Sequence, residues 1–409
     1  DRSPSRGLGD VYKRQPIGRA FSFSFFTFHL IAYRDSMEER LIRVGITQGD
    51  MNGVGYEVIL KTFAEEMMTD ICTPVIYGSL KALQYYRDTL TDITEPVIPN
   101  VIARAEEAEE GRVNLINCVA ADCPIAPGES TAEGGMAAFA SLEAAVADLK
   151  RGVIDTLVTA PINKHNIQHD GFHFPGHTEY LEACFGENGV YRSLMILTSD
   201  RLRVALVTGH VPLASVASHL TPEAITDKLI LFNTSLKEDF GIVRPRIAVL
   251  SLNPHAGDAG LLGEEEETVI RPAMAEAKKK GVLSFGPYAS DGFFGSSTFQ
   301  LFDGVLAMYH DQGLAPFKAL VMDEGVNFTA GLPIVRTSPD HGTAYDIAGR
   351  NRASEASFRQ AIYASIDIYR NREAYRQATL HPLRKEFVDK VGKDNVKLDL
   401  TQEVEEPEL

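Results

Sequence analysis

The sequence is poor in cysteine and has no cluster of basic residues. Its few cysteines form no CxxC pair; they are Cys72, Cys118, Cys123 and Cys184. Scattered cysteines in a chain of 409 residues are typical of reduced thiols in the cytosol, so we expect a cytoplasmic protein. The net charge is −16 and Lys and Arg do not gather in one stretch, which argues against a nucleic-acid partner.

No apolar run is long enough to cross a membrane. The aromatic stretch from Phe21 to Tyr33 is too short for a span and lacks a clear cleavage site of the signal-peptide type. We therefore expect no membrane partner. The stretch from Arg2 to Gln15 looks like translated adapter or vector sequence, and we predict a non-native or disordered leader over residues 1–36. Residues 396–409 are predicted to form an acidic tail.

From Leu41 onward, short apolar runs alternate with longer segments of helical periodicity. The predicted strands are 41–47, 74–78, 156–160, 194–197, 202–207, 246–252 and 305–308, and the predicted helices include 133–149, 222–240, 264–280 and 354–376. This alternation indicates an α/β protein with mainly parallel sheets. The chain is long enough for two domains and has no low-complexity linker, so chain crossings should join them. We expect a first α/β domain from 37–160 plus 310–395 and a second from 161–309.

Three histidines each follow one of the predicted strands. They are His210, His255 and His310. In open α/β sheets, ligands bind beyond the carboxyl ends of the strands. Neutral imidazole is also the commonest metal ligand, and three such ligands leave coordination positions open for water or substrate. The sequence therefore indicates a metal site, provided that the fold brings these histidines together.

Asp311 and Lys318 closely follow the last of these histidines. A His, an Asp and a Lys near one strand end can converge on a bound molecule, which makes these residues candidates for catalysis. The alternative is a histidine that only satisfies the strand end and a lysine on the surface.

Candidate anion-binding groups lie in two further segments. His177 and Thr178 stand in front of a predicted helix, 179–185, and helix N-termini bind anions through their free N–H groups. The alternative for Thr178 is a simple helix cap. Another polar cluster, Thr159 to Lys164, lies at the end of a predicted strand.

Lys318, Asn327 and Arg336 supply cationic and amide groups in the C-terminal part. We expect all three at strand ends, where they could form an oxyanion or phosphate pocket, with forked hydrogen bonds from Arg336. For any one of them alone, a surface salt bridge is the default interpretation.

The stretch from Gly49 to Glu57 is rich in glycine and lies between a predicted strand and a predicted helix. It matches neither GxGxxG nor GxxxxGK[ST], so it is a weak nucleotide fingerprint. Glycines that merely form a tight turn explain it equally well. The sequence therefore assigns no residue to a nucleotide cofactor.

Taken together, several segments resemble the 4-hydroxythreonine-4-phosphate dehydrogenases, the PdxA family. The segments are Pro175-Gly-His-Thr-Glu, Thr208-Gly-His-Val-Pro-Leu, Leu252-Asn-Pro-His-Ala-Gly, Met308-Tyr-His-Asp-Gln-Gly, Val326-Asn with Gly331-Leu-Pro, and Arg336-Thr-Ser-Pro-Asp-His-Gly-Thr. They occur in the order of that family. The loop that begins at Gly49 departs from it, because the family has Pro-Ala-Gly-Ile-Gly-Pro after the acidic residue.

The resemblance implies two α/β/α domains like those of isopropylmalate and isocitrate dehydrogenases. It implies a homodimer whose active site lies in the interdomain cleft at the dimer interface. The implied reaction is NAD-dependent oxidation of 4-phosphooxy-L-threonine to 2-amino-3-oxo-4-phosphooxybutanoate. That product loses CO2 to give 3-amino-2-oxopropyl phosphate in pyridoxal phosphate (vitamin B6) biosynthesis.

The resemblance also implies roles for particular residues. It matches the three histidines to the ligands of one divalent metal ion, Zn, Mg or Co, shared across the dimer: His210, His255 and His310. It matches five residues to substrate contacts: His177, Thr178, Lys318, Asn327 and Arg336. We expect His177, Lys318 and Asp311 to take part in catalysis.

Three alternatives remain at this point. Relatives of this family act on other phosphorylated hydroxy acids, such as D-threonate or D-erythronate 4-phosphate. A metal-dependent hydrolase of a phosphorylated metabolite would use the three histidines and a metal-bound water. A phosphate-binding acyltransferase of related fold would need no metal.

Overall fold

The computed structural model describes residues 40–91, 93, 95–169, 171–321 and 323–380. The predicted leader, 1–36, and the acidic tail, 396–409, lie outside these residues. A compact unit begins at Ile42 and contains the sheet and its helices. In the described part of the chain, no helix is long and apolar enough to cross a membrane.

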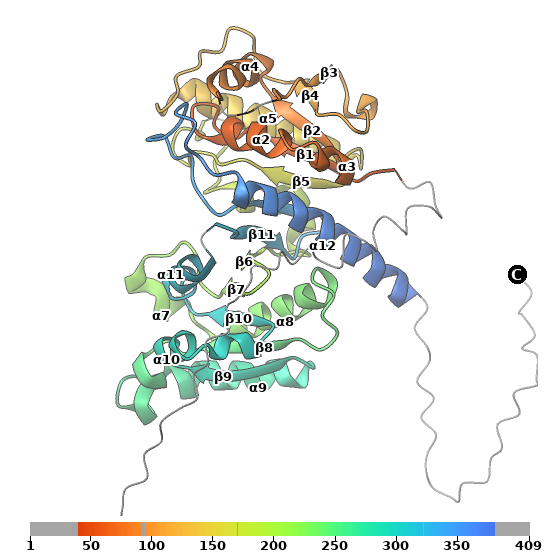
Figure 1. Cartoon of the computed structure of the whole chain (residues 1–409). Coiled ribbons are helices and arrows are strands. Elements are labelled where there is room, and N and C mark those ends of the chain that lie inside the picture. The colour runs from red at the N-terminus through yellow and green to blue at the C-terminus, as the bar shows by residue number, and fades with distance from the viewer. Residues whose placement is uncertain (1–39, 92, 94, 170, 322, 381–409) are drawn as a thin grey trace, which may run out of the picture. The chain divides into compact units, whose positions relative to one another are not determined.

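One sheet contains all the strands named here (Figure 1). The strands are β1 (Arg43–Thr47), β2 (Thr73–Gly78), β3 (Asn100–Ile102), β4 (Asn114–Asn117), β5 (Thr156–Thr159), β6 (Leu194–Thr198), β7 (Arg203–Leu206), β8 (Arg246–Leu250), β9 (Leu283–Tyr288), β10 (Gly304–Ala307), β11 (Val326–Ala330) and β12 (Arg336–Pro339). Their order is β3-β4-β2-β1-β5-β12-β11-β6-β7-β10-β8-β9. Most neighbours are parallel; β11 is antiparallel to β12 and β6, and β6 is antiparallel to β7. The predicted α/β class with a mainly parallel sheet is confirmed.

Helices connect most of the strands. They are α2 (Gly55–Phe63), α3 (Met67–Ile71), α4 (Leu80–Thr89), α5 (Ala132–Lys150), α6 (His177–Phe185), α7 (Val216–His219), α8 (Pro222–Glu238), α9 (Arg271–Lys279), α10 (Ser290–Gly295), α11 (His310–Val321) and α12 (Ala356–Leu380). Several start where the sequence predicts. The hydroxyl of Thr131 caps α5 by accepting from the N–H of Gly134, and Thr221 caps α8, which has Pro222 in its first turn.

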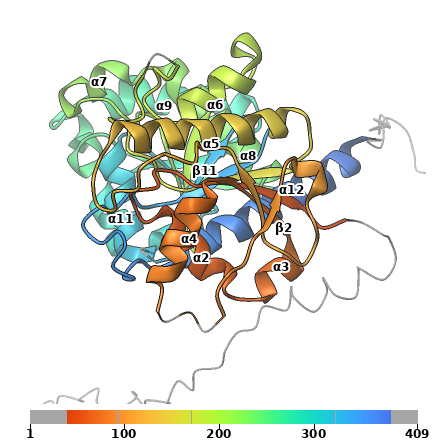
Figure 2. The ribbon, with the colours of Figure 1, turned by 90° about the horizontal axis from the view of Figure 1, so that it is seen from above.

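Helices cover both faces of the sheet, because successive side chains of a strand point to opposite faces. On β10, Val305 and Ala307 pack with α10 and α11, whereas Leu306 packs with α8 and α9. In the other half, Ile76 of β2 packs with α2, α4 and α12, and Tyr77 packs with α5. Figure 2 shows α5 across the sheet from α2 and α4.

The division into two domains stays a prediction. Two of the hydrophobic clusters contain strands β1, β2 and β5, and the other two contain β6, β7, β8 and β10. However, α11, which we assigned to the first domain, packs with β7, β8 and β10. Likewise α6, which we assigned to the second domain, packs with β2 and β5.

Three local differences from the prediction bear on the site. First, α6 begins at His177 rather than at residue 179. Second, the predicted helix 264–280 starts with a π-helical turn, Glu266–Ile270, which continues into α9. Third, a helix that was not among those predicted, α11, begins directly at His310 and runs through Gly313 and Pro316, although glycine and proline usually interrupt helices.

Candidate active site

The three histidines follow three neighbouring parallel strands, as the sequence predicts. The sheet order β7-β10-β8 places the ends that lead to His210, His310 and His255 side by side. Backbone pairing continues beyond β7 and β10, because the N–H groups of Val207 and Thr208 donate to the carbonyls of Ala307 and Met308 at 2.9 and 3.2 Å. As a result, the ring centroids of His210 and His310 are 5.9 Å apart.

The side chain of Gln312 connects three segments at this edge of the sheet by hydrogen bonds. Its side-chain oxygen accepts from the N–H of Met308 at 2.7 Å, and its amide donates to the carbonyl of Ser251 at 2.5 Å and to the hydroxyl of Ser290 at 2.8 Å. One buried side chain therefore joins the end of β10, the segment after β8 and the start of α10.

His255 lies in an unusual backbone segment. Residues 255–259 all have positive φ, although only Gly257 among them is a glycine. A left-handed conformation costs roughly 1–2 kcal/mol for each non-glycine residue. Contacts with the surrounding chain must offset that cost. The side chain of His255 in this segment is exposed to solvent.

The described part of this chain holds no preformed three-ligand metal site. In the described residues, no group of three or more His, Cys, Asp or Glu side chains is placed to hold a metal ion. The structure brings His210 and His310 together and places His255 after the next strand. The metal site formed by the three histidines stays a prediction.

His210 favours the neutral form. Although its side chain reaches solvent, partial burial lowers the pKa of His210, and the cationic Lys164 lowers it further. The Nζ atom of Lys164 lies 3.5 Å from the Nε2 atom of His210. On the other histidine, Nδ1 lies 2.7 Å from Oδ1 of Asp311. If that nitrogen donates to the carboxylate, the Nε2 lone pair of His310 is free for a ligand.

Arg336 is a buried cation bound by hydroxyl groups. Its side chain is 2% exposed. Its Nε and Nη2 atoms donate to the hydroxyl of Thr159 at 3.1 and 2.6 Å, and Nη1 donates to the hydroxyl of Thr329 at 3.1 Å. Burial lowers the pKa of Arg336 to about 10, and the nearby carboxylate of Glu179 opposes that change. Among the described residues, none forms an ion pair with it.

Two polar side chains among the candidate site residues have buried atoms without a hydrogen-bond partner among the described residues. They are His177, through Nε2, and Asn327, through Oδ1. Burial lowers the pKa of His177 well below its usual range, and the positive charges of Arg336 and Lys164 act in the same direction. Because unpaired buried polar atoms are costly, these atoms fit a site that is completed by a ligand.

Thr178 does not cap α6. The residue before the helix is Gly176, and Thr178 is the second residue of the helix. The alternative interpretation of Thr178 as the N-cap is therefore wrong, and its hydroxyl lies in the first helical turn beside His177.

Lys318 differs from its predicted position. It lies in the last part of α11 and not at a strand end, whereas Asn327 and Arg336 lie near the amino ends of β11 and β12. The Nζ atom of Lys318 donates to the carbonyl of Asp340 at 3.1 Å and lies 3.2 Å from its Oδ1 atom. Burial raises the pKa of Asp340, while Lys318, His341 and His310 oppose the rise.

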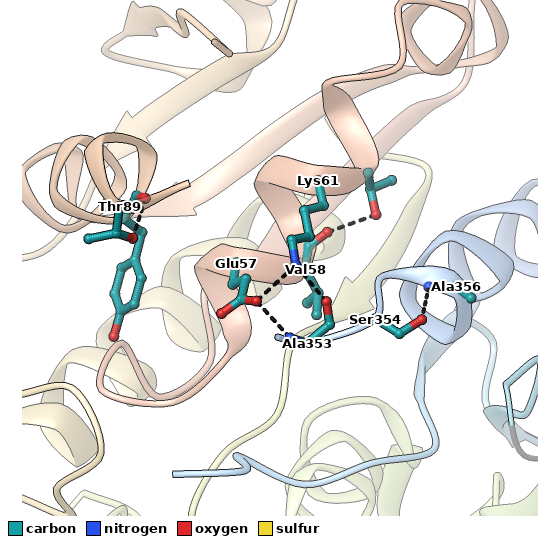
Figure 3. A network of polar contacts seen from close by, with 9 residues as sticks. Glu57, Val58, Lys61, Thr89, Ala353, Ser354 and Ala356 are labelled. Atoms are coloured by element: carbon teal, nitrogen blue, oxygen red, sulfur yellow. Dashed lines mark hydrogen bonds and ion pairs between the residues drawn. The ribbon is translucent and has the colours of Figure 1, made fainter. Parts of the chain in front are cut away.

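The chain that follows Asp340 is fastened to α2. Figure 3 shows the carboxylate of Glu57 accepting from the N–H of Ala353 at 2.7 Å and from Nζ of Lys61 at 2.9 Å. Nζ of Lys61 also donates to the carbonyl of Ala353 at 2.8 Å. Since Glu57 is fully buried, this network fixes where the loop after β12 returns to the first helix.

The glycines from the end of β1 to the start of α2 allow close contact with neighbouring backbone of the same chain. A Cβ atom on Gly49 would lie 2.3 Å from the carbonyl oxygen of Pro161. A Cβ atom on Gly53 would lie 2.7 Å from that of Thr343, and one on Gly55 would lie 2.3 Å from that of Gln48. The tight-turn interpretation therefore explains these glycines, and the turn does not fit a cradle for nucleotide phosphates.

Comparison with known proteins decides the family. Residues 70–365 match the model described as pyridoxal phosphate biosynthetic protein PdxA. The chain belongs to the PdxA family. A relative from Bacteroides thetaiotaomicron, named 4-hydroxythreonine-4-phosphate dehydrogenase, is 55% identical over 368 residues, which are 90% of this chain and 100% of the relative. A relative of the same name from Aquifex aeolicus is 44% identical over 326 residues, 80% of this chain and 98% of the relative.

Solved structures agree with this membership of the PdxA family. The crystal structure of 4-hydroxythreonine-4-phosphate dehydrogenase from Klebsiella pneumoniae has a TM-score of 0.70 and 34% identity, and the match covers 82% of this chain and 99% of that one. A terephthalate dihydrodiol dehydrogenase from Burkholderia xenovorans has a TM-score of 0.53 at 24% identity, which shows the shared fold alone.

Several contacts of the candidate site in this PdxA-family chain could not be predicted from the sequence. The polar cluster after β5 was noticed, but the contact of Lys164 with His210 was not predicted. The hydrogen bonds from Arg336 to its hydroxyl partners were not predicted either, and neither was the hydrogen bond from Lys318 to Asp340. These contacts join residues far apart in the chain, so local pattern carries no signal for them. A family alignment would be the signal most able to find them.

Proposed function

We propose that this protein is an NAD-dependent 4-hydroxythreonine-4-phosphate dehydrogenase of pyridoxal phosphate biosynthesis. It oxidises 4-phosphooxy-L-threonine to 2-amino-3-oxo-4-phosphooxybutanoate, which loses CO2 to give 3-amino-2-oxopropyl phosphate. The observation that carries the proposal is the relative of that name, which is 55% identical and matched along its whole length. The scattered cysteines further support a cytoplasmic enzyme.

We assign substrate binding to His177, Thr178, Lys318, Asn327 and Arg336. The substrate carries phosphate and carboxylate groups, so it needs local cations in a chain of net charge −16. Arg336 supports this assignment because three hydrogen bonds to hydroxyls leave some of its five N–H groups for an anion. The unpartnered Nε2 of His177 and Oδ1 of Asn327 supply neutral polar contacts beside it.

Three histidines fit the divalent metal that this dehydrogenase family implies. His210 is kept neutral, as a ligand must be, and its ring lies beside that of His310. We propose that His210, His255 and His310 hold one Zn, Mg or Co ion, with ligands shared between the two protomers of a homodimer. When bound, a divalent ion lowers the pKa of a substrate hydroxyl and polarises the ketone formed from it.

The chain's own residues orient the substrate and handle its protons. We propose that Nδ1 of His310 donates to Asp311, which orients the ring and leaves the Nε2 lone pair for a ligand. His177, held neutral by burial and by nearby positive charge, is placed to exchange a hydrogen bond with the substrate through Nε2. Lys318 presents an ammonium group whose position is set by Asp340. We therefore propose that His177, Lys318 and Asp311 serve the proton transfers.

NAD accepts the hydride in this reaction. The glycine turn between β1 and α2 does not fit its phosphates, because its glycines face the protein's own backbone.

An absorbance assay for NADH tests the proposal. The purified protein is supplied with NAD, a divalent metal and 4-phosphooxy-L-threonine, and in parallel with the D-isomer, D-threonate 4-phosphate or D-erythronate 4-phosphate. We expect NADH to form fastest with 4-phosphooxy-L-threonine. Faster turnover of another acid would move the substrate assignment within the family, and phosphate release without NADH would contradict a dehydrogenase.

A further inference from the structure

The strained segment that carries His255 is held by one buried carboxylate. Glu266, at the start of the π-helical turn, is 1% exposed. Its Oε1 atom accepts from the N–H groups of Leu252 and Asn253, both at 2.8 Å, and its Oε2 atom accepts from Nδ2 of Asn253 at 3.0 Å. Among the described residues, no cation forms an ion pair with Glu266.

The carboxylate of Glu266 also leaves no room for a side chain at Gly257, on the other side of His255. A Cβ atom on Gly257 would lie 2.7 Å from Oε2 of Glu266 and 2.7 Å from the carbonyl oxygen of Gly263, at a φ of +80°. The N–H of Leu262 closes the turn by donating to the carbonyl of Gly257 at 3.0 Å. The chain therefore wraps closely around Glu266 just before and just after His255.

Burying a carboxylate that has no cation partner is costly. The apolar packing around Glu266 does not itself require a charged side chain. An acceptor-only group is required by its surroundings, because three N–H donors converge on it. A glutamine would turn its amide toward the amide of Asn253. That amide cannot reverse without losing its second contact, to Oε2 of Glu265 at 2.7 Å.

We infer that Glu266 is a positioning residue for His255. It fixes the turn from Leu252 to Gly257 so that the imidazole is presented at the same sheet edge as His210 and His310. This inference rests on the proposed function, in which His255 is a metal ligand. The partners that orient a metal ligand typically change metal affinity by about 10- to 100-fold when they are removed.

The test compares two substitutions of the same kind in the full-length protein. Glu266→Gln replaces one acceptor oxygen and the negative charge with an amide that faces the amide of Asn253. Glu267→Gln is the control, because that carboxylate is exposed and pairs with Arg271 on the surface. Zn²⁺ affinity is measured by competition with a chromophoric chelator, without substrate. We expect Glu266→Gln to bind Zn²⁺ about 10- to 100-fold more weakly than the Glu267→Gln control.

Two further readouts separate positioning from general stabilisation. Hydrogen exchange of the Leu252 and Asn253 amides should be faster in Glu266→Gln, because a neutral amide oxygen accepts hydrogen bonds more weakly than a carboxylate, and it should be unchanged in the control. Saturating Zn²⁺ should restore turnover in Glu266→Gln, because the loss lies in metal affinity. Equal Zn²⁺ affinity in both variants, or a loss of turnover that Zn²⁺ does not restore, would overturn the inference.

Two more variants keep the result interpretable. If Glu266→Gln does not fold, Asn253→Ala removes only one of the three contacts and should weaken Zn²⁺ binding in the same direction; unchanged affinity there would overturn the inference. His210→Ala tests the metal site itself. If His210→Ala loses Zn²⁺ while Glu266→Gln binds normally, only the inference fails. If His210→Ala still binds Zn²⁺ normally, the proposed metal site fails and the role of Glu266 fails with it.

Discussion

The two sides of the candidate site differ in how far one chain completes them. Arg336 is buried and donates hydrogen bonds to hydroxyl groups of the same chain. Among the candidate substrate contacts, the buried Nε2 of His177 and Oδ1 of Asn327 have no hydrogen-bond partner among the described residues. At the histidine edge, His210 and His255 reach solvent, and the described residues hold no complete ligand group. The Arg336 region, which we propose as the anion side, is therefore preorganised within this chain, whereas the histidine side depends, we propose, on a metal and on a second protomer.

The histidine side should show the largest effect. Replacing His310 by Ala removes one imidazole without touching the buried cation, and we expect loss of nearly all bound metal and nearly all turnover. His219→Ala is the matched control, because that exposed histidine ends α7 and contacts the carbonyl of Ser215. Metal content is measured by elemental mass spectrometry. Full metal content in His310→Ala would show that this edge is not the metal site.

A buried ion pair outside both regions should alter stability alone. Asp239, which is 3% exposed, pairs with Arg372 of α12 at 2.5 Å and also accepts from the hydroxyl of Ser235. Leaving one buried charge unpaired costs about 3–5 kcal/mol, so Asp239→Asn should lower the free energy of unfolding in urea by roughly that amount. The exposed pair of Glu373 with Arg376 provides the control, Glu373→Gln. Unchanged stability in Asp239→Asn would contradict this account of the pair.

The anion side should respond to geometry more than to charge. Arg336→Lys keeps the positive charge but loses the planar fork. We expect kcat/KM for the phosphorylated substrate to fall by roughly 10- to 100-fold, which corresponds to about 1.5–3 kcal/mol, or one charge-assisted hydrogen bond. Arg203→Lys, at a partly buried arginine over the ring of Phe240, is the control. A non-phosphorylated analogue should lose much less. Equal losses for both would mean that Arg336 holds the carboxylate or the fold.

The smallest expected effect is a pH dependence on the anion side. The pKa of His177 lies well below 6.5 in the folded protein. As the pH falls, His177 is therefore protonated in the unfolded chain before it is protonated in the folded protein. The free energy of unfolding should therefore decrease as pH falls below about 6.5. Urea unfolding of His177→Gln should show a flatter decrease than the wild type, and the exposed His165→Gln should not. Identical slopes in wild type and His177→Gln would remove the basis for a neutral His177.

Features encoded in short stretches of sequence could be predicted. The three strand-end histidines were found because a brief apolar run marks each parallel strand and a polar residue marks its end. The start of α11 could not be predicted, because a glycine such as Gly313 usually interrupts a helix. In the structure a Cβ atom on Gly313 would lie 2.7 Å from Cγ1 of Val204, so this glycine allows the helix to lie close to the sheet.

Contacts between distant segments could not be predicted. Glu266 reaches the turn before His255 only because the chain folds back through a left-handed segment, which no residue pattern announces. Asp340 meets Lys318 because β12 brings its end beside α11. The sequence identified candidate side chains, while their partners depend on the tertiary structure.

We propose that the dehydrogenase reaction requires a bound divalent metal ion in addition to the phosphate-binding residues. The most direct measurement is the rate of NADH formation from 4-phosphooxy-L-threonine by the wild-type protein, before and after removal of metal by a chelator and again after Zn²⁺ is restored. We predict that chelation abolishes NADH formation and that added metal restores it. Undiminished NADH formation by the chelated protein would contradict the account.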